Sequence, residues 1–250
     1  MACNFDCIYC QVDRSVAPRV REVDPKKLEL ELAEMIKSAK SGSLFDDPEF
    51  ADVPPDKRHI YDIAFSGDGE PTTCKLFPDC VQIVASLRRE AGLMDTKIVL
   101  ITDACYLNKP HVAAGLAIMD TNNGRIWAKL DAGTEAYYHL VNRPNFPLQH
   151  VVDQIIGAAR VRPVVIQSLF MGVRGRPPEE SELLAYVKCL NEITRAGGQI
   201  EHVQVYTIAR RPAQPFVTAL TNEEVDHITT LVRERAQLRA EPYHALHGPA

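Results

Sequence analysis

The sequence has no apolar run long enough to cross a lipid bilayer, and it has no strong excess of basic charge. Its formal net charge is -5, so it lacks the broad positive field that a general nucleic-acid binder carries. Its first residues also lack the basic and apolar regions of a secretory signal peptide. We therefore expect a cytoplasmic protein without a membrane partner, in which the seven cysteines stay as free thiols.

The sequence also lacks low-complexity tracts, internal repeats and any shift in composition that would mark a domain boundary. A chain of 250 residues with 46% hydrophobic and 24% charged residues is long enough to bury a substantial core. We predict one domain over residues 1–236, followed by a loose C-terminal tail over residues 237–250 that shows no periodicity.

Short apolar runs alternate with amphipathic stretches along the whole chain. This alternation predicts parallel strands joined by right-handed helical crossovers, and continuous apolar runs are typical of strands covered on both faces. The predicted fold class is α/β, a partial (β/α)6 TIM-like barrel. The predicted strands are 60–67, 97–102, 125–131, 163–170 and 200–209, and the predicted helices are 25–40, 76–90, 111–118, 148–160, 179–195 and 222–235.

Three cysteines, Cys3, Cys7 and Cys10, lie in the opening stretch MACNFDCIYCQ with the spacing C-x3-C-x2-C. Three thiolates on one short loop can bind three corners of an iron–sulfur cube and leave the fourth iron open to a small molecule. Zinc normally needs a fourth protein ligand, and the other cysteines form no second pair. Three incidental buried cysteines are the remaining interpretation.

The residues CNFDCIYC resemble the cluster motif of the radical S-adenosylmethionine (SAM) superfamily. The resemblance implies that Cys3, Cys7 and Cys10 bind a 4Fe-4S cluster, that SAM binds its open iron, and that Tyr9 packs near the adenine of SAM. The family carries a strand before this loop, so we expect the chain to lack the first strand of the barrel, to show five strands, and to have one uncovered sheet edge.

A second motif, FSGDGEPT, follows the first predicted strand. Gly67 and Gly69 allow the backbone to approach a ligand closely, and Asp68 or Glu70 can accept from a cation, although a plain turn also explains the pattern. The family has a Gly-Gly-Glu motif here that binds the SAM ammonium group. Asp68 separates the two glycines in this sequence, which leaves open the choice between Asp68 and Glu70.

Polar residues also end the later strands. By resemblance, Asp131 and Gln167 contact the ribose and carboxylate of SAM, although each alone also fits a cap or turn residue. The stretches KLDAG, NRP and YTIARRP look like the group of iron–sulfur oxidoreductases related to the tRNA wybutosine-synthesis enzyme. Four arginines follow the last strands and suit an anionic substrate: Arg174, Arg176, Arg210 and Arg211.

The resemblance implies reductive cleavage of SAM to a 5'-deoxyadenosyl radical, which abstracts a hydrogen atom from a substrate that the sequence does not identify. A cytoplasmic electron donor is the implied partner, and an anionic compound or tRNA is the substrate class that the analogy suggests. The alternatives are a catalytically silent iron–sulfur protein and a zinc-binding protein.

Overall fold

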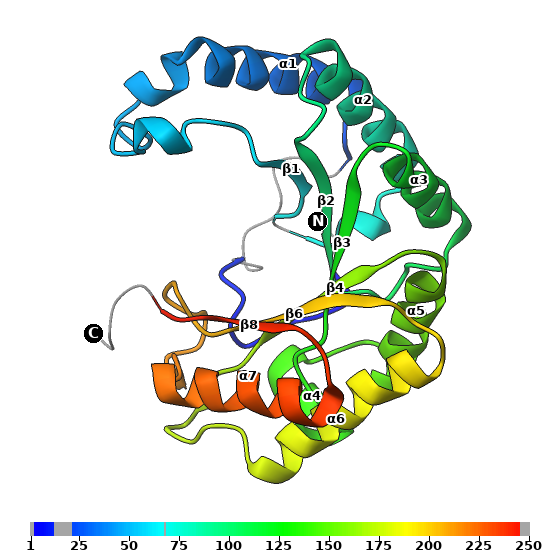
Figure 1. Cartoon of the computed structure of the whole chain (residues 1–250), viewed down its shortest axis with the longest axis vertical. Coiled ribbons are helices and arrows are strands. Elements are labelled where there is room, and N and C mark those ends of the chain that lie inside the picture. Colours follow the sequence, from blue (N-terminus) through cyan, green and yellow to red (C-terminus); the bar gives the residue numbers. More distant parts are fainter. Residues whose placement is uncertain (1–2, 13–21, 68, 246–250) are drawn as a thin grey trace.

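The structure, a computed structural model, describes residues 3–12, 22–67 and 69–245. Within these residues, six strands form one parallel sheet in the order β1-β2-β3-β4-β6-β8. Figure 1 shows that the sheet curves and that the helices cover its outer side, with the cysteine loop inside the curve. This arrangement is the α/β, partial TIM-like barrel that the sequence predicts.

The bounds of the elements agree with the predicted alternation to within a few residues over most of the chain. The parallel strands are β1 (Asp62–Phe65), β2 (Lys97–Thr102), β3 (Gly124–Lys129), β4 (Val164–Leu169), β6 (Ile200–Tyr206) and β8 (Ala240–Tyr243). The helices are α1 (Pro25–Ser41), α2 (Phe77–Glu90), α3 (Pro110–Asp120), α4 (Glu135–Asn142), α5 (Leu148–Val161), α6 (Glu180–Arg195) and α7 (Asn222–Ala236). Two short strands, β5 (Gly172–Val173) and β7 (Val217–Thr218), pair in antiparallel fashion outside this sheet.

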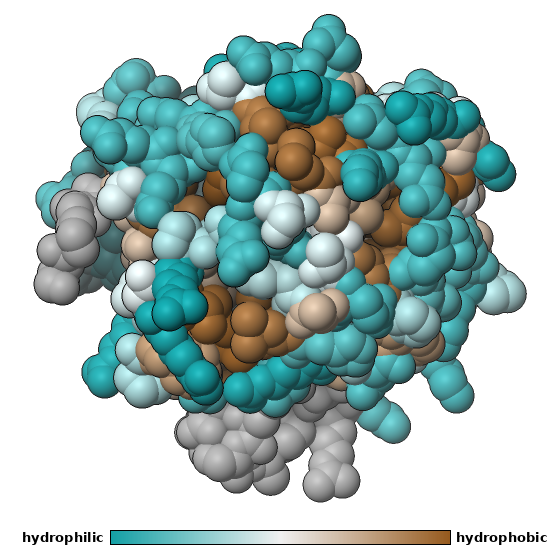
Figure 2. All heavy atoms as spheres, turned by 90° about the horizontal axis from the view of Figure 1, so that it is seen from below, coloured by the Kyte–Doolittle hydropathy of each residue, from teal (hydrophilic) through white to brown (hydrophobic). Residues whose placement is uncertain are grey.

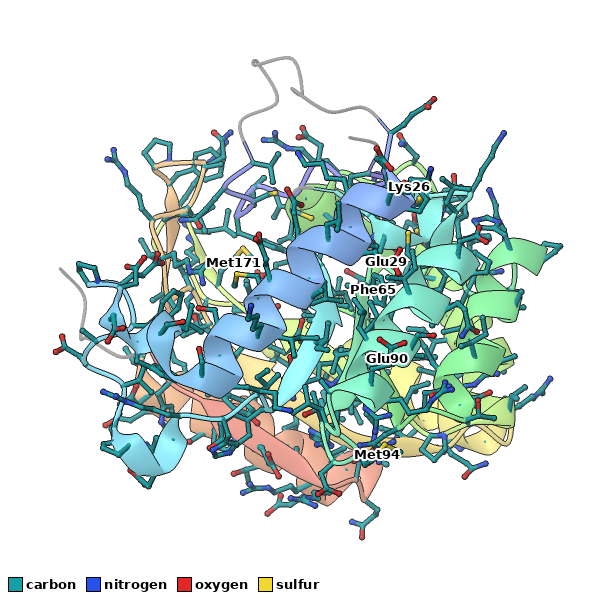
Figure 3. All side chains as sticks on the ribbon, turned by 90° about the horizontal axis from the view of Figure 1, so that it is seen from above. Lys26, Glu29, Phe65, Glu90, Met94 and Met171 are labelled. Atoms are coloured by element: carbon teal, nitrogen blue, oxygen red, sulfur yellow. The ribbon has the colours of Figure 1, made fainter. Side chains whose placement is uncertain are left out.

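Helix α1 begins and ends at the residues that its sequence favours. The side chain of Asp24 accepts hydrogen bonds from the backbone N–H groups of Lys26 and Lys27, which satisfies two donors that the first turn leaves free. Gly42 ends the helix with a φ of 87°, a left-handed conformation that glycine adopts without strain. Figure 3 shows α1 and α2 side by side, and Phe65 of β1 meets Phe77 of α2 edge to face, with ring centroids 5.5 Å apart.

The two faces of the sheet differ in character. Ile126 and Ala128 of β3 point toward the helices and are almost fully buried in the main core. Trp127 and Lys129 alternate with them and point toward the inside of the curve, where both are half-buried. The inner side of this partial barrel therefore carries polar side chains such as Lys129 among apolar ones, whereas a closed barrel fills its interior mainly with packed apolar side chains.

The prediction of a loose tail over 237–250 is wrong for residues 240–243, which form strand β8. Ala240 is 2% exposed, and β8 pairs with β6 along four residues. The strand is short and contains Pro242, which has no backbone N–H to donate, so its sequence lacks the usual strand pattern. Proline is tolerated at this position because β8 is the edge strand of the sheet.

The strand count of the parallel sheet is corrected accordingly, from five predicted strands to six in the described residues. At the opposite edge, β1 pairs only with β2 among the residues that the structure describes. The sequence also fails to predict α4 and the β5–β7 pair. Helix α4 has only 8 residues, so its pattern is too short to stand out.

No helix in the described part of the chain combines the length and the apolar character that a membrane span needs. The face seen from below is mostly hydrophilic, with hydrophobic side chains visible between the hydrophilic ones (Figure 2).

We expect Ala240→Glu to lower the free energy of unfolding by about 3 kcal/mol, because it forces a larger, polar side chain into a buried position that is packed against α7. Urea denaturation followed by circular dichroism measures this loss. Glu241→Ala is the matched control, since its side chain points to the other face of β8, and we expect it to cost less than about 1 kcal/mol. Equal stability of both variants and the wild type would contradict the assignment of β8.

Candidate functional site

The cysteine loop lies against the C-terminal end of α4. The backbone N–H of Asp6 donates to the carbonyl of Asn142 at 2.9 Å, and the N–H of Ile8 donates to the carbonyl of Val141 at 3.0 Å. A tight turn follows, in which the N–H of Cys10 donates to the carbonyl of Cys7 at 3.1 Å. These bonds fix the backbone between Cys3 and Cys10, and all three thiols of the loop are half-buried.

The apolar residues of the motif anchor the loop in two hydrophobic clusters. Phe5 is 3% exposed and meets Tyr138 of α4 edge to face, with ring centroids 5.6 Å apart. Ile8 is 1% exposed and belongs to a second cluster above the sheet, which also contains Val141, Leu169 and Met171. Burying such a side chain contributes about 1.5–3 kcal/mol, so the residues between the cysteines hold the loop in place.

Asp131, directly after β3, connects the loop to the sheet. Its Oδ2 accepts from the hydroxyl of Tyr9 at 2.6 Å and from Nδ2 of Asn142 at 2.9 Å. Its Oδ1 accepts from the backbone N–H of Leu169 at the end of β4, at 2.9 Å. The structure thus brings together Tyr9 and Asp131, two of the residues singled out in the sequence, and Asp131 is 2% exposed.

The turn after Asp131 is shaped by its contact with α6. A Cβ on Gly133 would lie 1.9 Å from the backbone nitrogen of Tyr186, so glycine is required where this turn touches the helix. The carboxylate of Glu182, in the first turn of α6, accepts from the backbone N–H groups of Gly133 and Thr134. These contacts fix the direction in which α4 leaves the sheet, and hence the position of the loop that α4 holds.

Glu70 of the FSGDGEPT motif is buried and faces the end of β2. Its Oε1 accepts from the hydroxyl of Thr102 at 2.7 Å and from the hydroxyl and backbone N–H of Thr72 at 2.6 Å and 3.0 Å. Its Oε2 accepts from the backbone N–H of Asp103 at 2.7 Å. Glu70 therefore ties the glycine turn to the strand end beside it.

The glycine turn itself is partly described. Gly67 has a φ of 122°, in the region that favours glycine, and Gly69 is half-buried beside Glu70. Asp68, the other carboxylate considered for the SAM ammonium group, lies outside the described residues. Glu70, at 5% exposure, uses both of its oxygens in the hydrogen bonds given above.

Glu70 and Asp103 form a buried pair of carboxyl groups. Burial, together with the neighbouring Asp103, raises the pKa of Glu70 to about 7. Burial also raises the pKa of Asp103, although its oxygens accept from Nδ2 of Asn4 and from the backbone N–H of Cys105. Because Asn4 follows Cys3 directly, this pair connects the cysteine loop to the glycine turn.

Gln167 lies on the inner face of β4, in a polar row that crosses three strands. It is in register with Lys129 of β3 and with Gln204 of β6, and its Nε2 donates to Oε1 of Gln204 at 3.1 Å. The next residue of β4, Ser168, bonds Tyr186 of α6 and so points the opposite way. Gln167 therefore faces the inside of the barrel, below the position of the cysteine loop.

Lys129 is the cation of this row that lies beside the loop, a role that we did not predict from the sequence. Its Nζ is 5.5 Å from the centre of the Tyr9 ring. Burial alone would lower the pKa of Lys129, yet its pKa is raised because Tyr206, Asp131 and Cys7 surround it. The signal in the sequence is a lysine near the end of a predicted strand, on the side that faces the inside of the barrel.

Cys7 is the cysteine whose surroundings are most fully defined. Burial and the neighbouring Asp131 raise the pKa of its thiol to about 12, while a hydrogen bond from Asn142 and the charge of Lys129 act in the opposite direction. Asn142 opens the stretch NRP, but neither that stretch nor the short helix α4 predicts its contact with Cys7. Metal binding to a thiol with such a pKa requires the proton to leave.

The four arginines after the last strands are exposed at the rim of the barrel. Arg174 directly follows β5, and its guanidinium lies 5.6 Å from the ring centre of Phe216, which directly precedes β7. The carbonyl of Arg211 accepts from the side chain of Gln11 at 2.6 Å, next to the cysteine loop. All four arginines, Arg174, Arg176, Arg210 and Arg211, are exposed.

The remaining cysteines do not join the loop as a second set of ligands. Cys74, Cys80, Cys105 and Cys189 are free thiols. Among the described residues, no three histidine, cysteine or acidic side chains are grouped around one point where a single ion would bind. A zinc ion needs its donors around one point, whereas the thiolates that bind a cube each bind a different iron atom.

Comparisons with known proteins find similarity in structure but not in sequence. No family model and no curated protein matches the sequence. Among solved structures, the crystal structure of archaeal TYW1 is similar to the chain, with a TM-score of 0.50 and 12% sequence identity. The alignment covers 92% of this chain and 69% of that one. At this identity the likeness shows a shared fold.

The raised pKa of Glu70 predicts how stability depends on pH. A carboxyl group whose pKa is higher in the folded state stabilises the fold at low pH, and this contribution is lost as pH rises through the folded pKa. Raising the pKa from 4.5 to about 7 corresponds to a loss of up to about 3 kcal/mol between pH 4.5 and pH 8. We expect Glu70→Gln to remove most of this slope, measured as the free energy of unfolding in urea at several pH values.

Two further variants complete this test. Asp103→Asn removes the neighbouring carboxyl group and should also flatten the slope, because the pKa of Glu70 then falls. Glu34→Gln, on an exposed position of α1, is the control and should leave the slope of the wild type unchanged. A wild-type slope in Glu70→Gln would show that this carboxyl group titrates as it does in the unfolded chain.

Proposed function

We propose that the chain is a radical SAM enzyme, in which Cys3, Cys7 and Cys10 hold a 4Fe-4S cluster. The observation that carries this proposal is the position of the C-x3-C-x2-C loop inside the curve of a parallel α/β sheet, beside the carboxyl ends of its strands. In barrels of this type the chemistry takes place at that end of the strands. The fold shared with archaeal TYW1 agrees with the proposal.

The residues present fit such a cluster. Three soft thiol donors lie on one loop that is fixed at Asp6 and Ile8 by backbone hydrogen bonds and is half-buried, which limits the access of water and oxygen. One thiol, Cys7, has an N–H donor at its sulfur. When bound, the cluster would supply one electron to the sulfonium group of SAM, and the fourth iron would bind the amino and carboxylate groups of SAM.

The chain's own residues hold the loop and provide charge near it. Asp131 fixes Tyr9, whose ring is then available as a wall for the adenine of SAM. Lys129 places a positive charge beside Cys7, which favours the thiolate that a metal needs. Glu70 shapes the glycine turn through Thr102 and Asp103, so the turn rather than a freely exposed Glu70 carboxylate would face the methionine part of SAM.

The substrate belongs to the same proposal. The exposed arginines suit an anionic substrate. Resemblance to the wybutosine-synthesis group makes tRNA, which carries anionic phosphates, a second candidate substrate. A cytoplasmic electron-donor protein would reduce the cluster. A silent iron–sulfur protein and a zinc protein are the competing functions, and the following experiment separates them.

We expect the full chain, reconstituted without oxygen with iron and sulfide, to bind about four iron atoms and to release 5'-deoxyadenosine from SAM in the presence of dithionite. Iron and sulfide assays, electron paramagnetic resonance and chromatography of the nucleoside measure these outcomes. Cys7→Ala should lose the brown colour, because two thiolates seldom retain a cube. Cys189→Ala, a half-buried thiol outside the loop, is the matched control and should keep it.

The other outcomes identify the alternatives. A brown protein that does not cleave SAM would support the silent iron–sulfur protein. A colourless protein that retains zinc through Cys3, Cys7 and Cys10 would support the zinc protein. A complete cluster in Cys7→Ala would show that the ligand assignment is wrong.

A further inference from the structure

Asn142, the last residue of α4 and the first residue of the stretch NRP, lies beside the cysteine loop. It is 1% exposed. Its Nδ2 is 3.4 Å from the sulfur of Cys7, 2.9 Å from Oδ2 of Asp131 and 3.5 Å from the hydroxyl of Tyr9. Its backbone carbonyl accepts from the N–H of Asp6. One residue therefore contacts the loop through both its backbone and its side chain.

Asp131 determines which end of the Asn142 amide faces the sulfur. A carboxylate accepts hydrogen bonds, so the NH2 group and not the carbonyl oxygen of the amide must point toward Asp131. The NH2 group has two hydrogens, and the second is directed at the sulfur of Cys7. The Oδ1 atom is buried and has no hydrogen-bond partner within the described residues, so the position of the amide comes from its NH2 group.

A backbone conformation that few residues adopt keeps Asn142 in this position. Arg143, the next residue, has a φ of 45° and ends α4 in the left-handed region. The chain turns there, and the carbonyl of Asn142 is left free to accept from the loop. Asn142 and Arg143 thus position the end of α4 against the backbone of the loop and the sulfur of Cys7.

We propose that Asn142 sets the reduction potential of the cluster through its N–H to the sulfur of Cys7, an inference that rests on the proposed function. One electron enters from an external reductant, no bond breaks, and negative charge increases on the thiolate sulfurs. A donor at the sulfur stabilises this charge, and hydrogen bonds to sulfur are one of the factors that set the potentials of iron–sulfur clusters. Asn142 is a positioning residue in this role, since it acts through Cys7.

Two other groups near Cys7 act differently. Lys129 favours the same negative charge through a field that solvent ions screen in part, whereas Asp131 opposes it. Asn142 is neutral and is held by Asp131, so its effect should not vary with pH or salt. A purely structural role for Asn142 would leave the potential unchanged.

The test measures the midpoint potential of the reconstituted full chain by redox titration followed with electron paramagnetic resonance. Asn142→Leu keeps the approximate size of the side chain and removes the donor. We expect a ratio of reduced to oxidised cluster at least tenfold lower at a fixed potential, which is a shift of about 59 mV for one electron. Iron content should stay close to that of the wild type.

Phe5→Leu is the matched control. It weakens the packing of the same loop against Tyr138 and removes no donor from Cys7, so the potential should stay at the wild-type value even if stability falls. An unchanged potential in Asn142→Leu, or an equal shift in Phe5→Leu, would overturn the role of Asn142.

A second measurement uses the wild-type protein and therefore does not depend on the folding of an Asn142 variant. Pulsed electron paramagnetic resonance on the reduced wild-type protein, with 15N in the asparagine side chains, should show coupling to a nitrogen beside the cluster. The side chain of Asn4 donates to Asp103, and an Asn4→Ser variant identifies any signal that it contributes. No coupling beyond that of Asn4 would overturn the inference.

Failure of the proposed function gives a different result. If the wild-type chain holds no cluster, the proposed function is wrong and the inference falls with it. A wild-type cluster whose potential ignores Asn142→Leu refutes the inference alone.

Discussion

The carboxylate of Asp131 is the group on which the arrangement of the site depends. It is almost fully buried and accepts from three separate segments: the cysteine loop through Tyr9, helix α4 through Asn142, and the end of β4 through the N–H of Leu169. A buried carboxylate that loses its hydrogen-bond donors destabilises the fold. The carboxylate of Asp131 therefore holds the three donor segments close to one another. The position of the three thiols follows from this one shared acceptor.

Helix α4 is the second part of this arrangement. In the described residues, the loop pairs its backbone with the end of α4 and not with a strand. Helix α4 is placed in turn by Thr134, which caps its first turn, and by Glu182 of α6, which accepts from the turn before it. The loop is therefore supported from the outer layer of helices, and a change in α6 can reach the thiols through Gly133 and α4.

The sequence predicts the strands and most of the helices because buried parallel strands are continuous apolar runs and their helices are amphipathic. It does not predict β8, since Pro242 removes the strand pattern at an edge where proline is tolerated. The sequence singles out Tyr9 and Asp131 as separate residues, but their contact spans 122 positions and follows no spacing rule. Asn142 lies in the stretch NRP, but its contact with Cys7 spans 135 positions and follows no spacing rule either. The capping residue Thr134 is a local signal for the helix that carries Asn142.

The charges near Cys7 show why these contacts belong together. Asp131 raises the cost of negative charge on the sulfur, and burial raises it further. The same carboxylate also orients the Asn142 amide, whose N–H offsets part of that cost at the sulfur. Removing Asp131 would therefore take away a repulsion and, at the same time, the group that aims the donor. The cost of negative charge on the sulfur of Cys7 therefore depends on geometry as well as on the neighbouring charges, because a neutral amide stabilises that charge only when its N–H points at the sulfur.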